Sequence, residues 1–367
     1  MSQNMRETKS PFASLYHWFI SHRGIAYATV GLSISLTFTG PISEAAALPT
    51  VDEVMQELHI SADDRENIRQ GKIVDWTASE GSDRELALGM AFLIKAKPEN
   101  LYEMYREALV LKQVSVITAN GTLTGEGTMA DLAGVKLQPN GEKEARRYLN
   151  AEPGDELNLD TKEIAAFQAL KAGGDADSVP VQKVESLIRQ VLLARYQAYR
   201  SKGLPGIAPY ERGNGKQRLA GDELLLSTNE LTGVAKHLPA FHKFLLNYPN
   251  GLNKDEAKNL EEFFYWLNIN VFGRPMFVLV HRILYHMGDA AMAIERHYYT
   301  SHDYNSMLQG IAAIPTKDGT FAFYIGRVST DQVAGFGSSA LHPVSRAITA
   351  PYIKDMFRKV QTNTEKR

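Results

Sequence analysis

Large apolar side chains alternate with smaller residues in one early segment. From Arg84 to Lys97, every second position up to Ile94 carries a large apolar residue. This period of two is typical of a β-strand with one face of large side chains. Pro98 then opens a segment, ending at Leu109, in which apolar residues recur three and four positions apart. Proline suits the first turn of a helix, so the pattern predicts a strand, a tight turn and an amphipathic helix.

Helical spacing recurs in three further segments, at residues 48–72, 181–200 and 224–246. Ser61 precedes two aspartates and is the expected N-cap within the first of them. Val114–Leu123 is an expected strand in an otherwise irregular stretch, and residues 173–178 form a polar connector.

The last third of the chain has the pattern of an antiparallel meander, with apolar runs separated by turn residues. The expected strands are Phe263–Phe272, Met276–His286, Ala291–Thr300, Met307–Ile314 and Thr320–Val328. Helical segments follow from about Gln332 to Val360. Pro343 and Pro351 are expected to prevent one straight helix there.

The charges of the first hairpin predict its register. With Gly288 and Asp289 in the turn, Arg282 lies opposite Glu295, and opposite charges across two strands are stabilising. The same register places His281 opposite Arg296 and Leu279 opposite Tyr298.

In the second hairpin, the expected register places Phe323 opposite Ala312 and Ile325 opposite Gly310. Small residues opposite large ones indicate a sheet that curves around a helix or a ligand.

The strand and helix at Glu85–Leu109, joined by the turn that starts at Lys95, together with the strands from Met276 to Val328, resemble the helix-grip fold of START-like proteins. In that superfamily a curved antiparallel sheet wraps a C-terminal helix and encloses an apolar cavity. We therefore expect an α+β fold, with a curved antiparallel sheet packed by helices. The START-like domain spans residues 81–367, with a helical insertion at about 124–245. An N-terminal helical segment at 48–80 precedes it.

The N-terminus has the three parts of a secretory signal peptide. Basic residues lie within 1–23, an uncharged run spans Gly24–Gly40, and Ala45 and Ala47 form a small-residue cleavage site. The run is short and rich in Ser and Thr for a membrane span of about 20 residues, although an uncleaved anchor is the alternative. We expect residues 1–47 to be removed and the protein to be periplasmic or secreted, without a membrane-spanning segment.

Three short segments support the same expectation. Tyr299–His302, Phe264–Trp266 and Thr330–Gly337 are similar to segments of a group of uncharacterised exported bacterial proteins. This resemblance implies export and assigns no activity.

Composition narrows the function classes. The 367 residues carry a formal net charge of −2, so nothing favours a nucleic-acid partner. Cysteine is absent, which excludes disulfides, thiolate metal sites and a cysteine nucleophile. No cofactor is expected.

Three possible chemistries have simpler structural interpretations. His281, His297 and Glu295 are metal-ligand types, but the register places the two histidines on opposite faces of the hairpin. The segment Gly335–Ser339, near His342, offers hydroxyls for hydrolysis or backbone N–H groups for an anion. It lacks a G-x-S-x-G motif and a parallel βαβ context, and it also fits a loop that enters a helix.

The remaining hypothesis is a cavity for an apolar or amphiphilic small molecule beneath the meander. A few polar groups among aromatic and aliphatic side chains are typical of such sites, and an arginine there is suited to a carboxylate or phosphate head group. The expected ligand-binding residues are His281, Tyr285, Arg296, Tyr298, Phe323 and Arg327. The alternatives are a hydrolase or isomerase that uses the same cavity, and a structural protein that binds an envelope protein partner.

Overall fold

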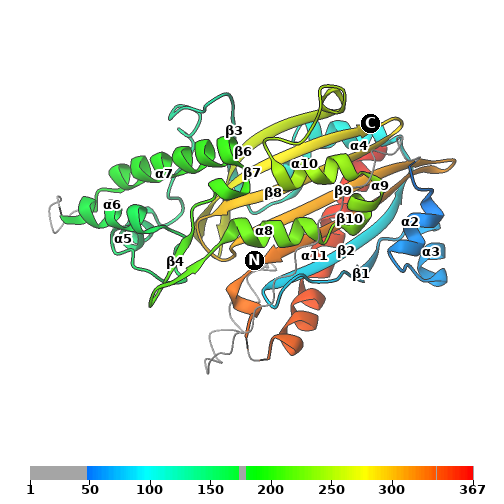
Figure 1. The fold of residues 1–367 in the computed structure, drawn as a ribbon. Coiled ribbons are helices and arrows are strands. Elements are labelled where there is room, and N and C mark those ends of the chain that lie inside the picture. Colours follow the sequence, from blue (N-terminus) through cyan, green and yellow to red (C-terminus); the bar gives the residue numbers. More distant parts are fainter. Residues whose placement is uncertain (1–47, 173–178, 336, 367) are drawn as a thin grey trace, which may run out of the picture.

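One antiparallel sheet of eight strands organises the part of the chain that the computed structural model describes, residues 48–172, 179–335 and 337–366 (Figure 1). The strand order is β1-β2-β10-β9-β8-β7-β6-β3. The strands are β1 (Val74–Thr77), β2 (Glu85–Ile94), β3 (Ile117–Leu123), β6 (Leu260–Val271), β7 (Arg274–Met287), β8 (Ala290–Thr300), β9 (Ser306–Thr316) and β10 (Gly319–Ser329). A small hairpin pairs β4 (Tyr210–Gly213) with β5 (Lys216–Arg218). The predicted signal peptide and the polar connector at 173–178 lie outside the described residues.

Helices lie on both faces of the sheet, so the α+β class expected from the sequence is confirmed. The helices are α2 (Val51–Glu57), α3 (Ala62–Arg69), α4 (Pro98–Arg106), α5 (Gly141–Leu149), α6 (Thr161–Ala172), α7 (Val181–Lys202), α8 (Ala220–Asn229), α9 (Thr232–His237), α10 (Pro239–Asn247) and α11 (Ser338–Glu365).

The two faces have different coverings. Met90, Ile311 and Leu284 lie on one face, where they pack with α4 and α11; we call it the α11 face. Ile294 and Phe264 lie on the other face, where they pack with helices of the inserted segment; we call it the insertion face. Helices α2 and α3 pack on the same side as the insertion, over β1 and β2. Both faces of the central strands are therefore buried.

The β2 strand and the α4 helix form where the sequence pattern predicts them. Strand β2 pairs with the last strand, β10, from Glu85 opposite Ser329 to Ile94 opposite Thr320. The two halves of the chain are thereby joined in one sheet, because β10 also continues the meander through β9.

The register of the second hairpin is as expected, with Phe323 opposite Ala312 and Ile325 opposite Gly310. The first hairpin also has the expected pairs of His281 with Arg296 and Arg282 with Glu295. Beyond them a bulge shifts the register, so Leu279 pairs with Tyr299 and the predicted pair with Tyr298 is wrong. A helix from the insertion accounts for this, because the Tyr298 ring stacks on Tyr199 of α7 at 4.0 Å.

Three other expectations differ from the structure. The segment 48–80 is not only helical, since it also contributes strand β1. The segment expected to be helical at 224–246 divides into α8, α9 and α10, and Pro239 begins the last of them. Helix α11 continues through both Pro343 and Pro351, where the sequence predicts separate helical segments. Packing maintains this helix, because Phe357 lies against Phe92 of β2 and Tyr324 of β10.

A glycine in β2 is required by its neighbour in β1. Gly89 lies opposite Trp76, and a Cβ at position 89 would come within 2.0 Å of the indole. Gly89→Val should therefore displace the indole and lower the free energy of unfolding by about 1–3 kcal/mol, which urea denaturation followed by tryptophan fluorescence measures. Gly233→Ala is the control, because a Cβ there meets no atom within 4 Å. Equal stability of the two variants would contradict the packing described.

Candidate functional site

A cavity of about 530 Å³ lies on the insertion face, at the end of the sheet that carries the β7–β8 and β9–β10 turns. Its floor is formed by sheet residues that include Trp76, Ala312 and Phe323. Its cover comes from α2 and α9, which lie near one another beside this end of the sheet in Figure 1. A volume of this size is within the range of small-molecule sites.

Small residues lie between the large ones on this face of the sheet. In neighbouring rows across the sheet, Gly89 and Gly310 flank Ile325, and Ala312 lies beside Phe323. The space over the two glycines is filled, since a Cβ at position 310 would be 2.7 Å from Ile294 Cδ1 and one at position 89 would meet the Trp76 indole. Of these three small residues, Ala312 lines the cavity.

Polar groups are few in the cavity and are mostly engaged. Arg327 lines it, and its Nη1 donates to Glu85 Oε2 at 2.9 Å and to the Ser79 carbonyl at 2.8 Å. Glu85 also accepts hydrogen bonds from Ser227 Oγ and the Gly81 N–H. Arg327 and Glu85 are 1% and 2% exposed, so this is a buried ion pair in the cavity wall.

Two other acidic groups line the cavity. Glu57 of α2 pairs with His237 of α9 at 2.9 Å and with Lys236. The Lys236 hydrogen bond lowers the pKa of Glu57 against the effect of burial. Glu230 accepts the Ser79 hydroxyl at 2.7 Å. These pairs connect the two covering helices and link the edge of the sheet to the end of α8.

Of the six residues expected to bind a ligand, Phe323 and Arg327 line this cavity. Tyr285 lies on the same face, but its ring stacks on Phe241 of α10 at 4.5 Å. His281, Arg296 and Tyr298 lie further along β7 and β8, beneath the inserted helices. The six residues therefore do not form one group.

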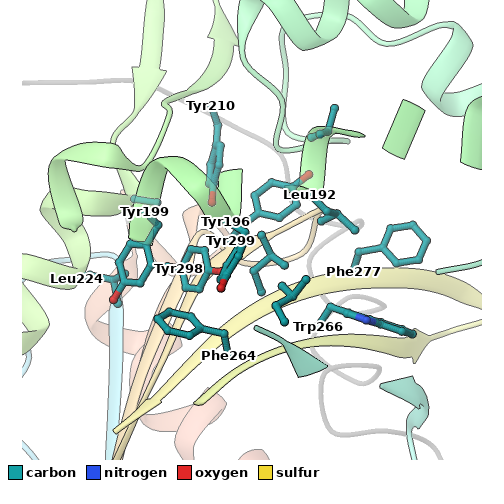
Figure 2. Packing of buried hydrophobic residues seen from close by; sticks show 14 of the residues in the cluster. Leu192, Tyr196, Tyr199, Tyr210, Leu224, Phe264, Trp266, Phe277, Tyr298 and Tyr299 are labelled. Atoms are coloured by element: carbon teal, nitrogen blue, oxygen red, sulfur yellow. The ribbon is translucent and has the colours of Figure 1, made fainter. Parts of the chain in front are cut away.

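His281 is held in the aromatic core. Its Nδ1 lies 2.9 Å from the Tyr199 hydroxyl, and its Nε2 lies 2.9 Å from Glu262 Oε1. Burial lowers the pKa of this imidazole, against the opposing effect of Glu262. Figure 2 shows Tyr199, Tyr298 and Phe264 gathered in this part of the core. A neutral histidine with both nitrogens engaged has a structural role here.

Arg296 forms hydrogen bonds with the helices that cover it. Its Nη2 donates to the Leu245 carbonyl in the last turn of α10 and to Thr228 Oγ1 of α8 at 3.2 Å. A cation at a helix C-terminus is favourable because the exposed carbonyls carry partial negative charge. Arg296 Nε and Nη1 have no hydrogen-bond partner among the described residues.

The described residues do not assemble the metal site or the hydrolase site considered from the sequence. Among the described residues, no three His, Asp or Glu side chains are placed to hold a metal ion. His342 bonds Glu80 Oε2 at 2.5 Å through Nδ1 and the Asp83 carbonyl at 3.1 Å through Nε2. The imidazole therefore does not bond a hydroxyl of Gly335–Ser339.

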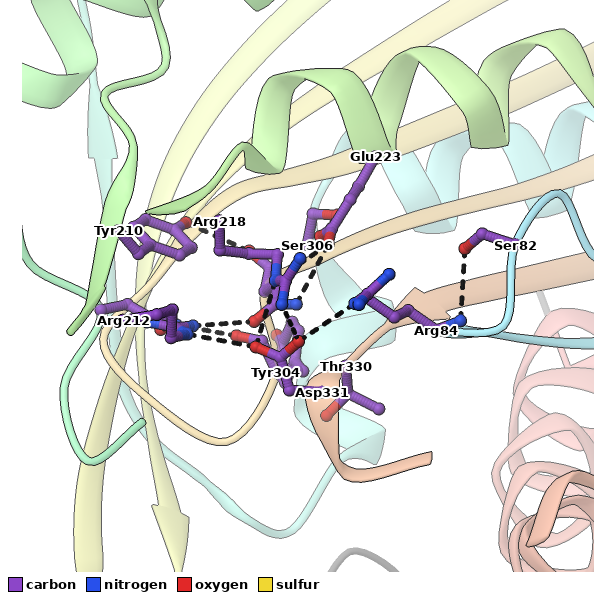
Figure 3. A network of polar contacts seen from close by, with 12 residues as sticks. Ser82, Arg84, Tyr210, Arg212, Arg218, Glu223, Tyr304, Ser306, Thr330 and Asp331 are labelled. Atoms are coloured by element: carbon purple, nitrogen blue, oxygen red, sulfur yellow. Dashed lines mark hydrogen bonds and ion pairs between the residues drawn. The ribbon is translucent and has the colours of Figure 1, made fainter. Parts of the chain in front are cut away.

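A network of arginines around Asp331 was not predicted from the sequence (Figure 3). The Asp331 carboxylate accepts hydrogen bonds from Arg84, Arg212 and Arg218. Although burial raises the pKa of Asp331, Arg218 and Arg212 bring it below the usual value. These residues come from three segments far apart in the chain, since Arg212 and Arg218 belong to one hairpin, and no local pattern indicates their meeting.

Glu223 of α8 is the unusual member of this network. It accepts hydrogen bonds from Asn305 and Ser306, and Arg218 Nε lies 3.7 Å away. Burial, with a contribution from the nearby Asp331 carboxylate, raises the pKa of Glu223 to about 7. The carboxyl group is therefore half protonated near neutral pH in the folded protein.

No protein family, curated protein or solved structure was found to match this chain. Among the helices of the described residues, none has the length and hydrophobicity required of a transmembrane segment.

The raised pKa of Glu223 predicts a pH-dependent stability. The folded state retains a proton that the unfolded chain loses near pH 4.5, so this group's contribution to stability decreases as the pH rises from about 4.5 to 7. As the pH rises through this window, the free energy of unfolding of Glu223→Gln should increase relative to that of the wild type by on the order of 2–3 kcal/mol. Urea denaturation at a series of pH values measures the difference.

Asp222→Asn is the matched control, since Asp222 is exposed on the same helix. Its difference from the wild type should stay constant over this pH range. Parallel pH profiles for Glu223→Gln and the wild type would contradict the prediction.

Proposed function

We propose that the protein binds an apolar or amphiphilic small molecule in the cavity on the insertion face. The cavity carries this proposal, because its floor and cover are mostly apolar and only a few polar groups converge on it. Phe323 and Arg327 are the two residues from the sequence analysis that we retain as ligand contacts. Ala312 joins them from the same predicted hairpin, and Trp76 and Leu231 join them from segments that the sequence analysis did not connect with it.

We also propose a START-like, helix-grip architecture for residues 81–367. Three features support it: the pairing of β2 with the last strand, the α4 helix that directly follows β2, and a long C-terminal helix on the same face. The large cavity lies on the opposite face of the sheet, however. Between α11 and the sheet there is a cavity of about 80 Å³, in contact with Leu88 and Tyr324. The ligand site proposed here thus depends on the insertion.

Export is proposed from residues 1–47 and from the resemblance of three short segments to exported bacterial proteins. Leu48, the first residue after the expected cleavage site, lines the cavity. Cleavage after Ala47 would therefore place the new N-terminus at the rim of the binding site.

The enzymatic alternative requires a base beside a nucleophile in this cavity. Ser79 Oγ does donate to the Glu230 carboxylate. Serine nucleophiles are usually activated by an imidazole, however, and His237 is held by Glu57 and bonds no hydroxyl in the described part of the chain. We therefore favour binding without turnover.

Filling the cavity should abolish binding. The Ala312→Phe variant places a ring in the space above the floor, so it should weaken binding of the neutral fluorescent probe N-phenyl-1-naphthylamine at least tenfold. Fluorescence titration measures the dissociation constant. Ala347→Phe is the matched control, because Ala347 is exposed on α11, on the other face of the sheet. Equal affinity of Ala312→Phe and the wild type would exclude this cavity as the site.

Native mass spectrometry of the protein purified from its host tests the same proposal without a chosen probe. A bound small molecule released by organic solvent would support it, and the Ala312→Phe variant should lose that molecule. A second polypeptide in its place would favour the partner-binding alternative.

A further inference from the structure

The charges of the cavity wall restrict the head group of a ligand. An arginine in an apolar cavity is expected to hold an anion, but the charge of Arg327 is already compensated. Its Nη1 bonds the Glu85 carboxylate at 2.9 Å, and both side chains are almost fully buried. Its Nη2 donates to the Glu230 carbonyl at 3.3 Å. An anionic ligand would therefore find a neutral pair and not a free cation.

The last donor of Arg327 is not offered to the cavity. The Nε–H group has no acceptor among the described residues, but it is buried, with almost no accessible surface. A ligand oxygen in the cavity therefore does not reach it. Arg327 supplies neither an uncompensated charge nor an accessible donor at this nitrogen.

The other ionisable groups that line the cavity are Glu57, Glu230, His59 and His237. Glu57 has its cationic partners in Lys236 and His237. Glu230 forms no ion pair with the described residues, and it accepts a hydrogen bond from the Ser79 hydroxyl. A ligand carboxylate would lose its hydration and gain a negative neighbour in Glu230.

We infer that the cavity takes an uncharged amphiphile and discriminates against the corresponding carboxylate. This inference rests on the proposed function and adds the chemical class of the ligand. It replaces the anionic head group expected from the sequence. The charge of Arg327 is already compensated by Glu85, and Glu230 is the residue that disfavours the anion.

Displacement of N-phenyl-1-naphthylamine by two probes of equal chain length, 1-dodecanol and dodecanoate, tests the inference at pH 8. Dodecanol should bind more tightly to the wild type. Because the two probes also differ in their hydration, the decisive quantity is the change in their affinity ratio on mutation. Glu230→Gln should improve dodecanoate binding about three- to tenfold and leave dodecanol binding unchanged, since it removes one charge at short range.

Glu66→Gln provides the matched control, because it makes the same change in net charge at an exposed position of α3, outside the cavity lining. It should leave the ratio unchanged. Tighter binding of dodecanoate or dodecylammonium than of dodecanol by the wild type would overturn the head-group inference, as would an unchanged ratio in Glu230→Gln. The proposed function would stand in those cases. Failure of every probe to bind would overturn the proposed function as well.

Discussion

The buried ion pair of Arg327 with Glu85 holds together the parts that build the cavity. Glu85 begins β2 and Arg327 lies near the end of β10, so the pair fastens the two strands that connect the halves of the sheet. Through Ser227 the same carboxylate fixes α8, and through Ser79 the arginine fixes the chain after β1. Removal of one partner would leave a buried charge uncompensated, which typically costs 3–5 kcal/mol. The two helices that cover the cavity, α2 and α9, depend on elements that this pair positions.

The same kind of contact attaches helices to both faces of the meander. Arg296 of β8 lies opposite His281, the neighbour of Arg282 in β7. Neighbouring strand residues point to opposite faces, so the two arginines serve different layers. On the α11 face, Arg282 pairs with Glu295 and donates to the Tyr105 carbonyl at the end of α4. On the insertion face, Arg296 donates to the Leu245 carbonyl of α10. Each layer of helices is thus hydrogen-bonded to the sheet by a buried guanidinium group.

The local parts of the structure were predictable from the sequence, and the long-range parts were not. Strand β2, helix α4 and the hairpin registers follow from periodicity and from cross-strand charge, which act between near neighbours. The bulge at Tyr298 depends on Tyr199, about a hundred positions away in the chain. Of the cavity, the small residues opposite Phe323 and Ile325 were recognisable as part of a curved sheet. Its cover was not, because α2 and α9 come from two distant segments of the chain.

The insertion face is filled in one half and hollow in the other, and side-chain size explains the difference. Under α7, α8 and α10, Tyr298 and Phe264 fill the space between sheet and helices. Towards the hairpin turns, Ala312 leaves space, and the short helix α9 above it contains no buried residue. Helix α9 therefore forms a roof and does not fill the space beneath it. A core normally closes around apolar side chains at high density, and the cavity of about 530 Å³ beneath α9 departs from this rule; the small molecule proposed above would fill it.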